Sequence, residues 1–121
     1  MSKKILIVDD DQINRKLLAT MLSKQKGYVV EEAQNGVEAL SKLTPDTALV
    51  LLDLIMPVMD GLTFLQRYRI EKPECANVPI LVLTTDDSKK NEAKSLGAKE
   101  VIIKPINPVE IMEKIATYLE D

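Results

Sequence analysis

Residues 48–61 of the chain read ALVLLDLIMPVMDG. The first five letters form an apolar run without alternation, which is typical of a β-strand buried on both faces of a sheet. The run ends in a carboxylate, Asp53, and the chain then turns at Pro57 and Gly61. In an open parallel sheet, ligands bind at the carboxyl ends of the strands. We therefore expect Asp53 to be a charged group that a rigid strand delivers to a binding edge.

Strand and helix patterns alternate along the whole chain. The segments with the composition of strands are residues 5–8, 28–33, 48–53, 79–85 and 101–103. Each is followed by a segment whose apolar residues recur at helical spacing. In the first of these segments, one broad apolar stripe is formed by Ile13, Leu17, Leu18, Met21 and Leu22. These helices are predicted to begin at the capping residues Asp11, Asn35, Asp60, Asp86 and Asn107. Such strict alternation predicts a parallel sheet with helices on both faces, joined by right-handed crossovers.

The bulk composition limits what the chain can be. Its 121 residues are enough for one domain, and a hydrophobic fraction of 45% is enough for a core. A net charge of −3, with acids and bases well mixed, argues against a nucleic-acid-binding surface. No apolar run approaches the roughly 20 residues of a membrane span, and the N-terminus lacks a secretory signal. A single cysteine, Cys75, is expected to be an incidental loop thiol and fits a cytoplasmic location.

The chain contains no histidine. This absence excludes histidine general-base catalysis, imidazole metal ligands and phosphohistidine chemistry on this chain. Its chemistry must therefore come from carboxylates, amines, hydroxyls or backbone groups.

Polar side chains stand at the carboxyl ends of four predicted strands. Asp9 and Asp10 follow the first strand, Asp53 ends the third, Thr84 ends the fourth and Lys104 follows the fifth. Two unit charges 4 Å apart interact by roughly 4 kcal/mol at an effective dielectric of 20. A cluster of carboxylates must therefore take up protons, recruit a lysine or bind a hard cation. Oxygen ligands without histidine or thiol favour Mg²⁺.

The same set is suited to phosphoryl transfer onto a carboxylate, because it combines a nucleophile, a cation site, an ammonium group and a hydroxyl. Over essentially its whole length the chain resembles the receiver domain of two-component response regulators. The motifs that carry the resemblance are ILIVDDD at 5–11, DLIMP at 53–57, DG at 60–61, LT at 83–84, LGA at 96–98 and KP at 104–105. Each motif alone is common, but their order and spacing on alternating elements are specific.

The resemblance implies a fold and a function. The fold is a flavodoxin-like, doubly wound (βα)5 sandwich of three layers, with a five-stranded parallel sheet of order 2-1-3-4-5 in one receiver domain, residues 1–121. The function is a phosphoacceptor signalling switch rather than an enzyme that turns over an external substrate. The implied phosphoryl donor is a sensor histidine kinase or a histidine phosphotransfer protein. The target is an unidentified protein, and neither nucleic acid nor a membrane is bound directly.

The resemblance also implies a role for each acid. Asp53 would accept the phosphoryl group in a Mg²⁺-dependent reaction and would itself be a metal ligand. Asp10 would ligate Mg²⁺ directly and Asp9 mainly through water. The backbone carbonyl of Ile55 would complete the protein ligands.

The remaining motif residues would act on the phosphoryl group and its donor. Lys104 would pair with the phosphoryl group, and Thr84 would form a hydrogen bond to it once it arrives. The bond between Lys104 and Pro105 is expected to be cis, as in such domains. The first helix, around Asn14 and Arg15, would form part of the docking surface for the donor.

Three positions depart from the usual pattern of the family. Val101 stands where an aromatic residue normally reports the movement of the threonine, Thr85 replaces a smaller residue, and Ile106 replaces a common phenylalanine. These departures bear on the switch mechanism more than on phosphorylation.

An enzyme is one competing hypothesis. A strand followed by Asp9-Asp10-Asp11 is similar to the start of haloacid-dehalogenase-like phosphatases, in which the first Asp is the nucleophile. The small hydroxyl and glycine residues that normally follow are replaced by Gln12 and Ile13, and the chain is short for that fold. A flavin carrier is less favoured, since only 3% of residues are aromatic.

Two further hypotheses keep the fold but change the role. One is a binding module that no longer needs phosphate, against which the intact set of acids, threonine and lysine argues. The other is a receiver that belongs to a longer regulator with an output domain. The start at Met1 and the stop after the last predicted helix favour a stand-alone regulator.

Overall fold

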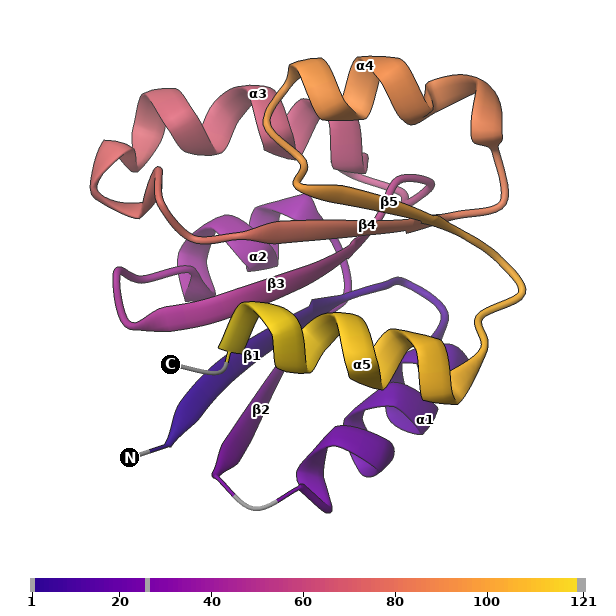
Figure 1. The fold of residues 1–121 in the computed structure, drawn as a ribbon. Helices are drawn as coiled ribbons and strands as arrows, with labels where there is room; N and C mark the ends of the chain where they lie inside the picture. The colour runs from indigo at the N-terminus through magenta and orange to yellow at the C-terminus, as the bar shows by residue number, and fades with distance from the viewer. Residues whose placement is uncertain (1, 26, 120–121) are drawn as a thin grey trace.

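The structure is a computed structural model that describes residues 2–25 and 27–119, and Figure 1 shows these as one twisted sheet between two layers of helices. The strands in this part of the chain are β1 (Lys3–Val8), β2 (Tyr28–Ala33), β3 (Thr47–Asp53), β4 (Ile80–Thr84) and β5 (Glu100–Ile103). The α-helices are α1 (Gln12–Ser23), α2 (Gly36–Lys42), α3 (Gly61–Glu71), α4 (Lys90–Ser95) and α5 (Pro108–Leu119). Two short 3₁₀ helices, η1 (Pro73–Cys75) and η2 (Asp87–Lys89), precede β4 and α4.

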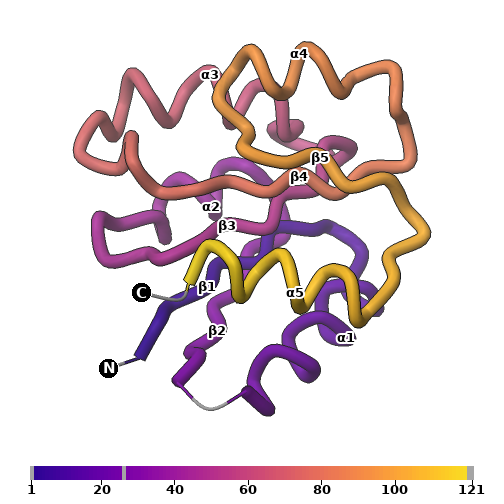
Figure 2. Tube along the Cα trace, in the orientation of Figure 1, coloured from indigo at the N-terminus to yellow at the C-terminus, as the bar shows by residue number. Residues whose placement is uncertain are grey.

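The sheet has the strand order β2-β1-β3-β4-β5, and every neighbouring pair is parallel. This confirms the predicted doubly wound fold and strand order. The register of the strands brings the carboxyl ends of β3, β4 and β5 level with one another, because Asp53 pairs with Leu83 and Thr84 pairs with Ile103. The loops that carry function therefore leave the sheet at one common edge. β1 begins and α5 ends on the opposite side of the molecule (Figure 2).

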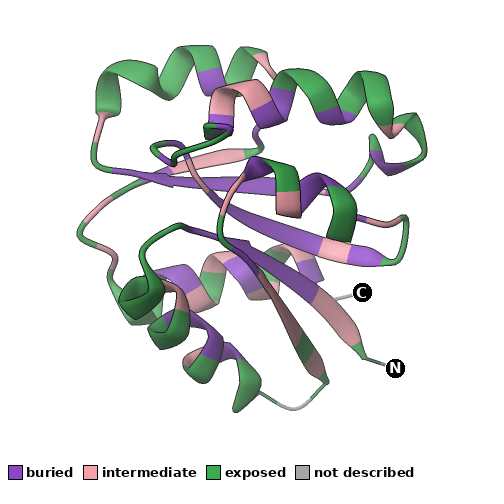
Figure 3. Cartoon of the chain, turned by 180° about the vertical axis from the view of Figure 1, so that it is seen from behind, coloured by how far each residue is buried: buried purple, intermediate pink, exposed green. Residues whose placement is uncertain are grey.

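The hydrophobic core lies in two layers, one on each face of the sheet. Successive strand residues alternate between them, so that Leu6 packs with α2, α3 and α4 whereas Ile5 packs with α1 and α5. Both layers exclude solvent, and the central strands are therefore buried along most of their length (Figure 3). Burial on both faces is the physical reason for the continuous apolar run before Asp53.

The predicted helix starts are mostly confirmed by hydrogen bonds. The side chains of Asp11, Asn35, Asp60 and Asn107 each accept a bond from a backbone N–H in the first turn that follows. Asp86 instead caps the 3₁₀ helix η2 through the N–H of Ser88, and α4 begins later. Among the described helices, none has the length and apolar character required to cross a membrane.

Helical spacing alone predicted the buried face of α1 incorrectly. Leu18 and Leu22 are buried as expected, but Ile13 is 73% exposed and Leu17 is 65% exposed. The apolar stripe on α1 is wider than the strip of helix that the sheet can cover. Cys75, expected to be an incidental loop thiol, is instead fully buried in the core beside α3.

Backbone hydrogen bonds fix the loop that follows β3. The N–H of Met59 donates to the carbonyl of Pro57 at 2.8 Å, which closes a three-residue γ-turn around Val58 at φ +70°. The N–H of Gly36, at the start of α2, donates to the Met59 carbonyl at 3.1 Å. The Met59 side chain is buried. The segment that follows Asp53 is therefore held against α2.

Candidate functional site

Three carboxylates meet at the carboxyl edge of the sheet, as predicted. One oxygen each from Asp9, Asp10 and Asp53 lies within 4.8 Å of the other two. The ends of the adjacent strands β1 and β3 place them there. Asp9 is buried, Asp53 is partly buried and Asp10 is exposed, so that the cluster opens to solvent on the side of Asp10.

Backbone amides orient two of these carboxylates. Oδ1 of Asp9 accepts a hydrogen bond from the N–H of Asp11 at 2.8 Å, and Oδ1 of Asp53 accepts one from the N–H of Ile55 at 3.2 Å. The Oδ2 atoms of both acids face the ammonium group of Lys104. The role of the Ile55 carbonyl as a metal ligand stays a prediction.

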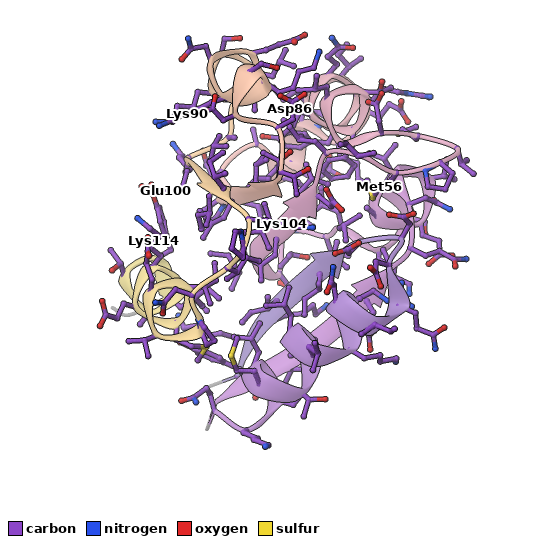
Figure 4. The ribbon with its side chains drawn as sticks, turned by 90° about the vertical axis from the view of Figure 1, so that its right-hand side faces the viewer. Met56, Asp86, Lys90, Glu100, Lys104 and Lys114 are labelled. Atoms are coloured by element: carbon purple, nitrogen blue, oxygen red, sulfur yellow. The ribbon has the colours of Figure 1, made fainter. Side chains whose placement is uncertain are left out.

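Lys104 brings the one positive charge that pairs with this cluster in the described residues. Its Nζ lies 3.4 Å from Oδ2 of Asp53 and 3.8 Å from Oδ2 of Asp9. Its backbone N–H donates to the carbonyl of Thr84 at 2.8 Å, and the bond to Pro105 is cis, as expected. Figure 4 looks onto this edge of the sheet, with Lys104 near its middle. The lysine offsets part of the repulsion between the acids.

Thr84 is fully buried at the end of β4. Its Oγ1 accepts a hydrogen bond from the N–H of Asp86 at 3.1 Å. Thr85, the next residue, is exposed and lines the groove beside Lys104. Val101 packs against the core layer of α2, α3 and α4, whereas Ile106 packs against the layer of α1 and α5. The structure thus places Thr84 at the predicted edge, bound to its own loop.

Burial raises the pKa of Asp9 to about 6, and the charge of Asp53 acts in the same direction. The hydrogen bond from Asp11 and the charge of Lys104 oppose this shift only in part. The folded protein therefore holds a proton on Asp9 more tightly than the unfolded chain does. The sequence predicted like-charge repulsion within such a cluster, whereas the larger cause, desolvation of Asp9, follows from its burial in the folded protein.

The raised pKa of Asp9 predicts how the stability of the metal-free protein depends on pH. The folded state gains stability from the protonated carboxyl below the ordinary pKa of 3.8 and loses it as the pH rises through about 6. Asp9→Asn should remove this dependence and raise the free energy of unfolding at pH 7 by about 3 kcal/mol. Urea unfolding in EDTA between pH 4 and pH 7 measures both effects. If the free energy of unfolding changed equally with pH in the two proteins, Asp9 would not be the group with the raised pKa.

The chemistry of the donor set fits a hard divalent cation. All the side-chain donors in the cluster are carboxylate oxygens, and those of Asp9 and Asp53 are already oriented by backbone N–H groups. The exposed Asp10 gives access from solvent. Mg²⁺ binds through one or two carboxylates and keeps several waters, which suits a cluster that is open on one side.

Two features of the site were not found from sequence. Arg15, expected on a docking surface, turns inward and donates from Nη1 to the carbonyl of Asp9 at 2.7 Å, whereas Asn14 stays exposed. Gly61 packs so closely on β3 that a Cβ atom would lie 2.6 Å from the carbonyl oxygen of Asp53. Gly61 was recognised in the sequence as part of a motif, but its contact with the backbone of Asp53 exists only in the folded protein.

An acidic pocket with a lysine and a hydroxyl, at the carboxyl edge of a sheet of order 2-1-3-4-5, defines a class: the flavodoxin-like signalling domains. Comparison with known proteins agrees. The family model of the response regulator receiver domain matches residues 5–116. This chain therefore belongs to the response regulator receiver domain family.

Individual relatives support this assignment. The transcriptional regulatory protein CpxR homolog of Haemophilus influenzae is 39% identical over 118 residues, which are 96% of this chain and 50% of that protein. The probable transcriptional regulator ycf27 of Porphyridium aerugineum is 40% identical over 97% of this chain and 48% of that protein. The chain thus spans about half the length of the curated relatives it matches.

Solved structures give the same fold. The chemotaxis response regulator CheY4 of Vibrio cholerae has a TM-score of 0.87 and 34% identity, with 98% of this chain and 100% of that chain covered. The response regulator TrrA of Thermotoga maritima, in complex with Mg²⁺ and beryllofluoride, has a TM-score of 0.81 and 34% identity over 97% of this chain and 99% of that one. Both likenesses extend over almost the entire domain.

Proposed function

We propose that this chain is a phosphorylation-dependent switch in which Asp53 is the phosphoacceptor. The observation that carries the proposal is the place of its carboxylate. It ends a buried strand, lies in the cluster with Asp9 and Asp10, and has the ammonium group of Lys104 at 3.4 Å. Asp53 therefore combines a fixed position with solvent access beside a positive charge.

The transfer would require the nucleophile and metal ligands of this edge, a phosphoryl donor and Mg²⁺. A carboxylate oxygen of Asp53 forms a bond to phosphorus, the bond from phosphorus to the donor nitrogen breaks, and that nitrogen leaves with the electron pair. Asp9, Asp10, Asp53 and the carbonyl of Ile55 would hold Mg²⁺. When bound, the ion would offset negative charge on the phosphoryl oxygens and the carboxylates.

Lys104 and Thr84 would stabilise the phosphorylated state. The ammonium group that now pairs with Asp53 would bind a phosphoryl oxygen through a charge-assisted hydrogen bond. The hydroxyl of Thr84 would turn toward the phosphoryl group, away from its present bond with the N–H of Asp86. That turn would move the loop before η2 and thereby alter the face formed by α4, β5 and α5.

A groove beside the pocket supports a phosphohistidine-bearing protein as the donor, either a sensor histidine kinase or a phosphotransfer protein. It runs between α1 and the loop from β5 to α5, and the exposed side chains of Ile13 and Leu17 line one wall. Asp9 and Lys104 line the same groove, so that it leads to the acids. An apolar helix face docked there would present its phosphohistidine to Asp53.

The haloacid-dehalogenase alternative is less compatible with the site. It requires Asp9 as the nucleophile, yet Asp9 is only 3% exposed and has a pKa raised to about 6. Asp53 is the more accessible of the two acids next to Lys104. We propose a switch rather than an enzyme acting on an external substrate.

The switch is tested by nuclear magnetic resonance spectra of the ¹⁵N-labelled protein with Mg²⁺, before and after addition of beryllofluoride. We expect large shifts for the amides of Thr84, Asp86 and Lys104, and small shifts for β2, which lies at the far edge of the sheet. Thr84→Ala should keep the response at Lys104 and lose most of the response at Asp86. A spectrum that beryllofluoride leaves unchanged would refute the proposal.

A further inference from the structure

Arg15 connects the back of the acidic cluster to the neighbouring strand. Its Nη1 donates to the backbone carbonyl of Asp9 at 2.7 Å, and its Nε donates to Oε1 of Glu32 at 3.0 Å. The side chain is 13% exposed, and it starts from α1 and reaches across to β2. One planar guanidinium group therefore holds two elements of the protein at once.

Glu32, the carboxylate that binds Arg15, is itself held in place by a second hydrogen bond. Its other carboxylate oxygen, Oε2, accepts a hydrogen bond from Nζ of Lys16 at 2.9 Å. Burial works against its ionised form, but the hydrogen bonds from Lys16 and Arg15 hold the pKa of Glu32 below its ordinary value. Glu32 is thus a fixed anion on β2. The next residue, Ala33, also contacts the site, because its carbonyl accepts a hydrogen bond from the N–H of Asp9 at 3.0 Å.

The bond from Arg15 acts on the peptide group between Asp9 and Asp10. The carbonyl oxygen of this peptide group accepts the hydrogen bond from the guanidinium group. The preceding peptide group is also held, because the N–H of Asp9 donates to the carbonyl of Ala33. Because a peptide group is planar, holding it fixes the N–Cα bond of the next residue, so that the side chain of Asp10 can change direction only by rotation about that bond and within its own rotamers. Asp10 is the exposed member of the cluster and has the fewest other restraints among the three acids, because a backbone amide orients Asp9 and another orients Asp53.

We propose that Arg15 is a positioning residue for the cation site. Anchored on Glu32, it holds the peptide between Asp9 and Asp10 in the orientation that turns the Asp10 carboxylate toward Asp9 and Asp53. The inference rests on the proposed function, in which these acids hold Mg²⁺. It assigns Arg15 to the interior of the site rather than to the surface that meets a partner.

Lys16 provides a matched control for this proposal. It is the next residue, carries the same charge and binds the same carboxylate, but among the described residues its hydrogen bond goes to Glu32 and not to Asp9. Lys16→Met and Arg15→Met therefore both remove one positive charge and one bond to Glu32. Only Arg15→Met also releases the carbonyl of Asp9.

The first measurement uses the metal-free protein. The N–H of Asp11 donates to Oδ1 of Asp9, and its exchange with solvent reports the order of this loop. In EDTA, Arg15→Met should speed exchange of the Asp11 amide by about tenfold, whereas Lys16→Met should leave it within about twofold of wild type. Urea unfolding of both variants separates this local effect from a loss of global stability.

The second measurement is the Mg²⁺ affinity, obtained from the amide shifts of Ile55 during titration with MgCl₂. Loss of an outer support of a metal site weakens metal binding by about tenfold or more. We expect about that loss in Arg15→Met, no change in Lys16→Met and an intermediate loss in Glu32→Gln, which keeps Arg15 but removes its anchoring charge.

The outcomes distinguish the positioning role of Arg15 from the proposed binding of Mg²⁺ by the three acids. If Arg15→Met and Lys16→Met match in both exchange and affinity, Arg15 does not position the site and the inference is overturned. If wild type fails to bind Mg²⁺, the proposed function fails, but amide exchange in EDTA still tests the positioning by Arg15. If Arg15→Met does not fold, Glu32→Gln carries the test, and wild-type behaviour in that variant overturns the inference.

Discussion

Asp53→Asn should abolish phosphorylation of this chain by a small-molecule donor such as phosphoramidate. The amide that replaces the carboxylate is nearly the same size but is not a nucleophile, so that we expect the rate to fall by a factor on the order of 10³ or more. Lys104 and the remaining acids should keep their places in the variant, because the asparagine side chain has nearly the same shape. Intact-protein mass spectrometry, in the presence of Mg²⁺, measures the fraction that has gained one phosphoryl group.

The control for this variant is Asp46→Asn. Asp46 is an exposed carboxylate just before β3, at the end of the strand opposite Asp53, and its loss should leave the rate unchanged. The competing enzyme hypothesis predicts another pattern, in which the modification survives Asp53→Asn and disappears in Asp9→Asn. That result would transfer the acceptor role to Asp9 and refute the proposed function.

Gly61→Ala should destabilise the fold and distort the site at the same time. An added Cβ would lie 2.6 Å from the carbonyl oxygen of Asp53 and 2.7 Å from the Cα of Leu54, so that backbone would have to move. We expect a loss of about 3 kcal/mol in the free energy of unfolding, since overpacking against backbone outweighs the gain from replacing glycine in a helix. Urea unfolding measures the loss, and the phosphorylation rate should fall because the backbone of Asp53 is displaced.

Gly36→Ala is the matched comparison, because each glycine is the first residue of a helix. Its added Cβ would meet Cγ, Sδ and Cβ of Met59 at 2.7 to 2.9 Å; Cγ and Sδ can rotate away, so that only the contact with Cβ, the longest of the three, requires a shift of the backbone. We expect a smaller loss, about 1 kcal/mol. Equal losses in the free energy of unfolding would show that the close contact of Gly61 with the backbone of Asp53 is no more restrictive than the contact of Gly36 with Met59.

The sequence predicted the fold and the members of the pocket well, because both depend on local patterns. Continuous apolar runs identified the buried strands, and polar residues at the ends of those runs identified Asp9, Asp10, Asp53, Thr84 and Lys104. In a parallel sheet, strand ends meet at one edge whatever the helices do. The structure accordingly brings three acids and the lysine together, while their individual roles stay predictions.

Helical spacing served less well, because it marks an apolar stripe but not how much of that stripe a sheet covers. Ile13 and Leu17 belong to the predicted stripe of α1 and are nevertheless mostly exposed. Cys75 lies in a short segment without any repeating pattern, so that its burial against the core could not be anticipated. In both cases the outcome depends on which neighbouring element lies close in space.

The order of the motifs along the chain was enough to predict the family, the strand order and the acids of the pocket. Tertiary structure alone decided that Arg15 turns inward to the carbonyl of Asp9 and that Gly61 lies against the backbone of Asp53. The physical reason is the range of the interactions. Apolar runs and helix caps are patterns formed by residues close in sequence, whereas Arg15 and Glu32 are 17 positions apart and meet only when α1 packs beside β2.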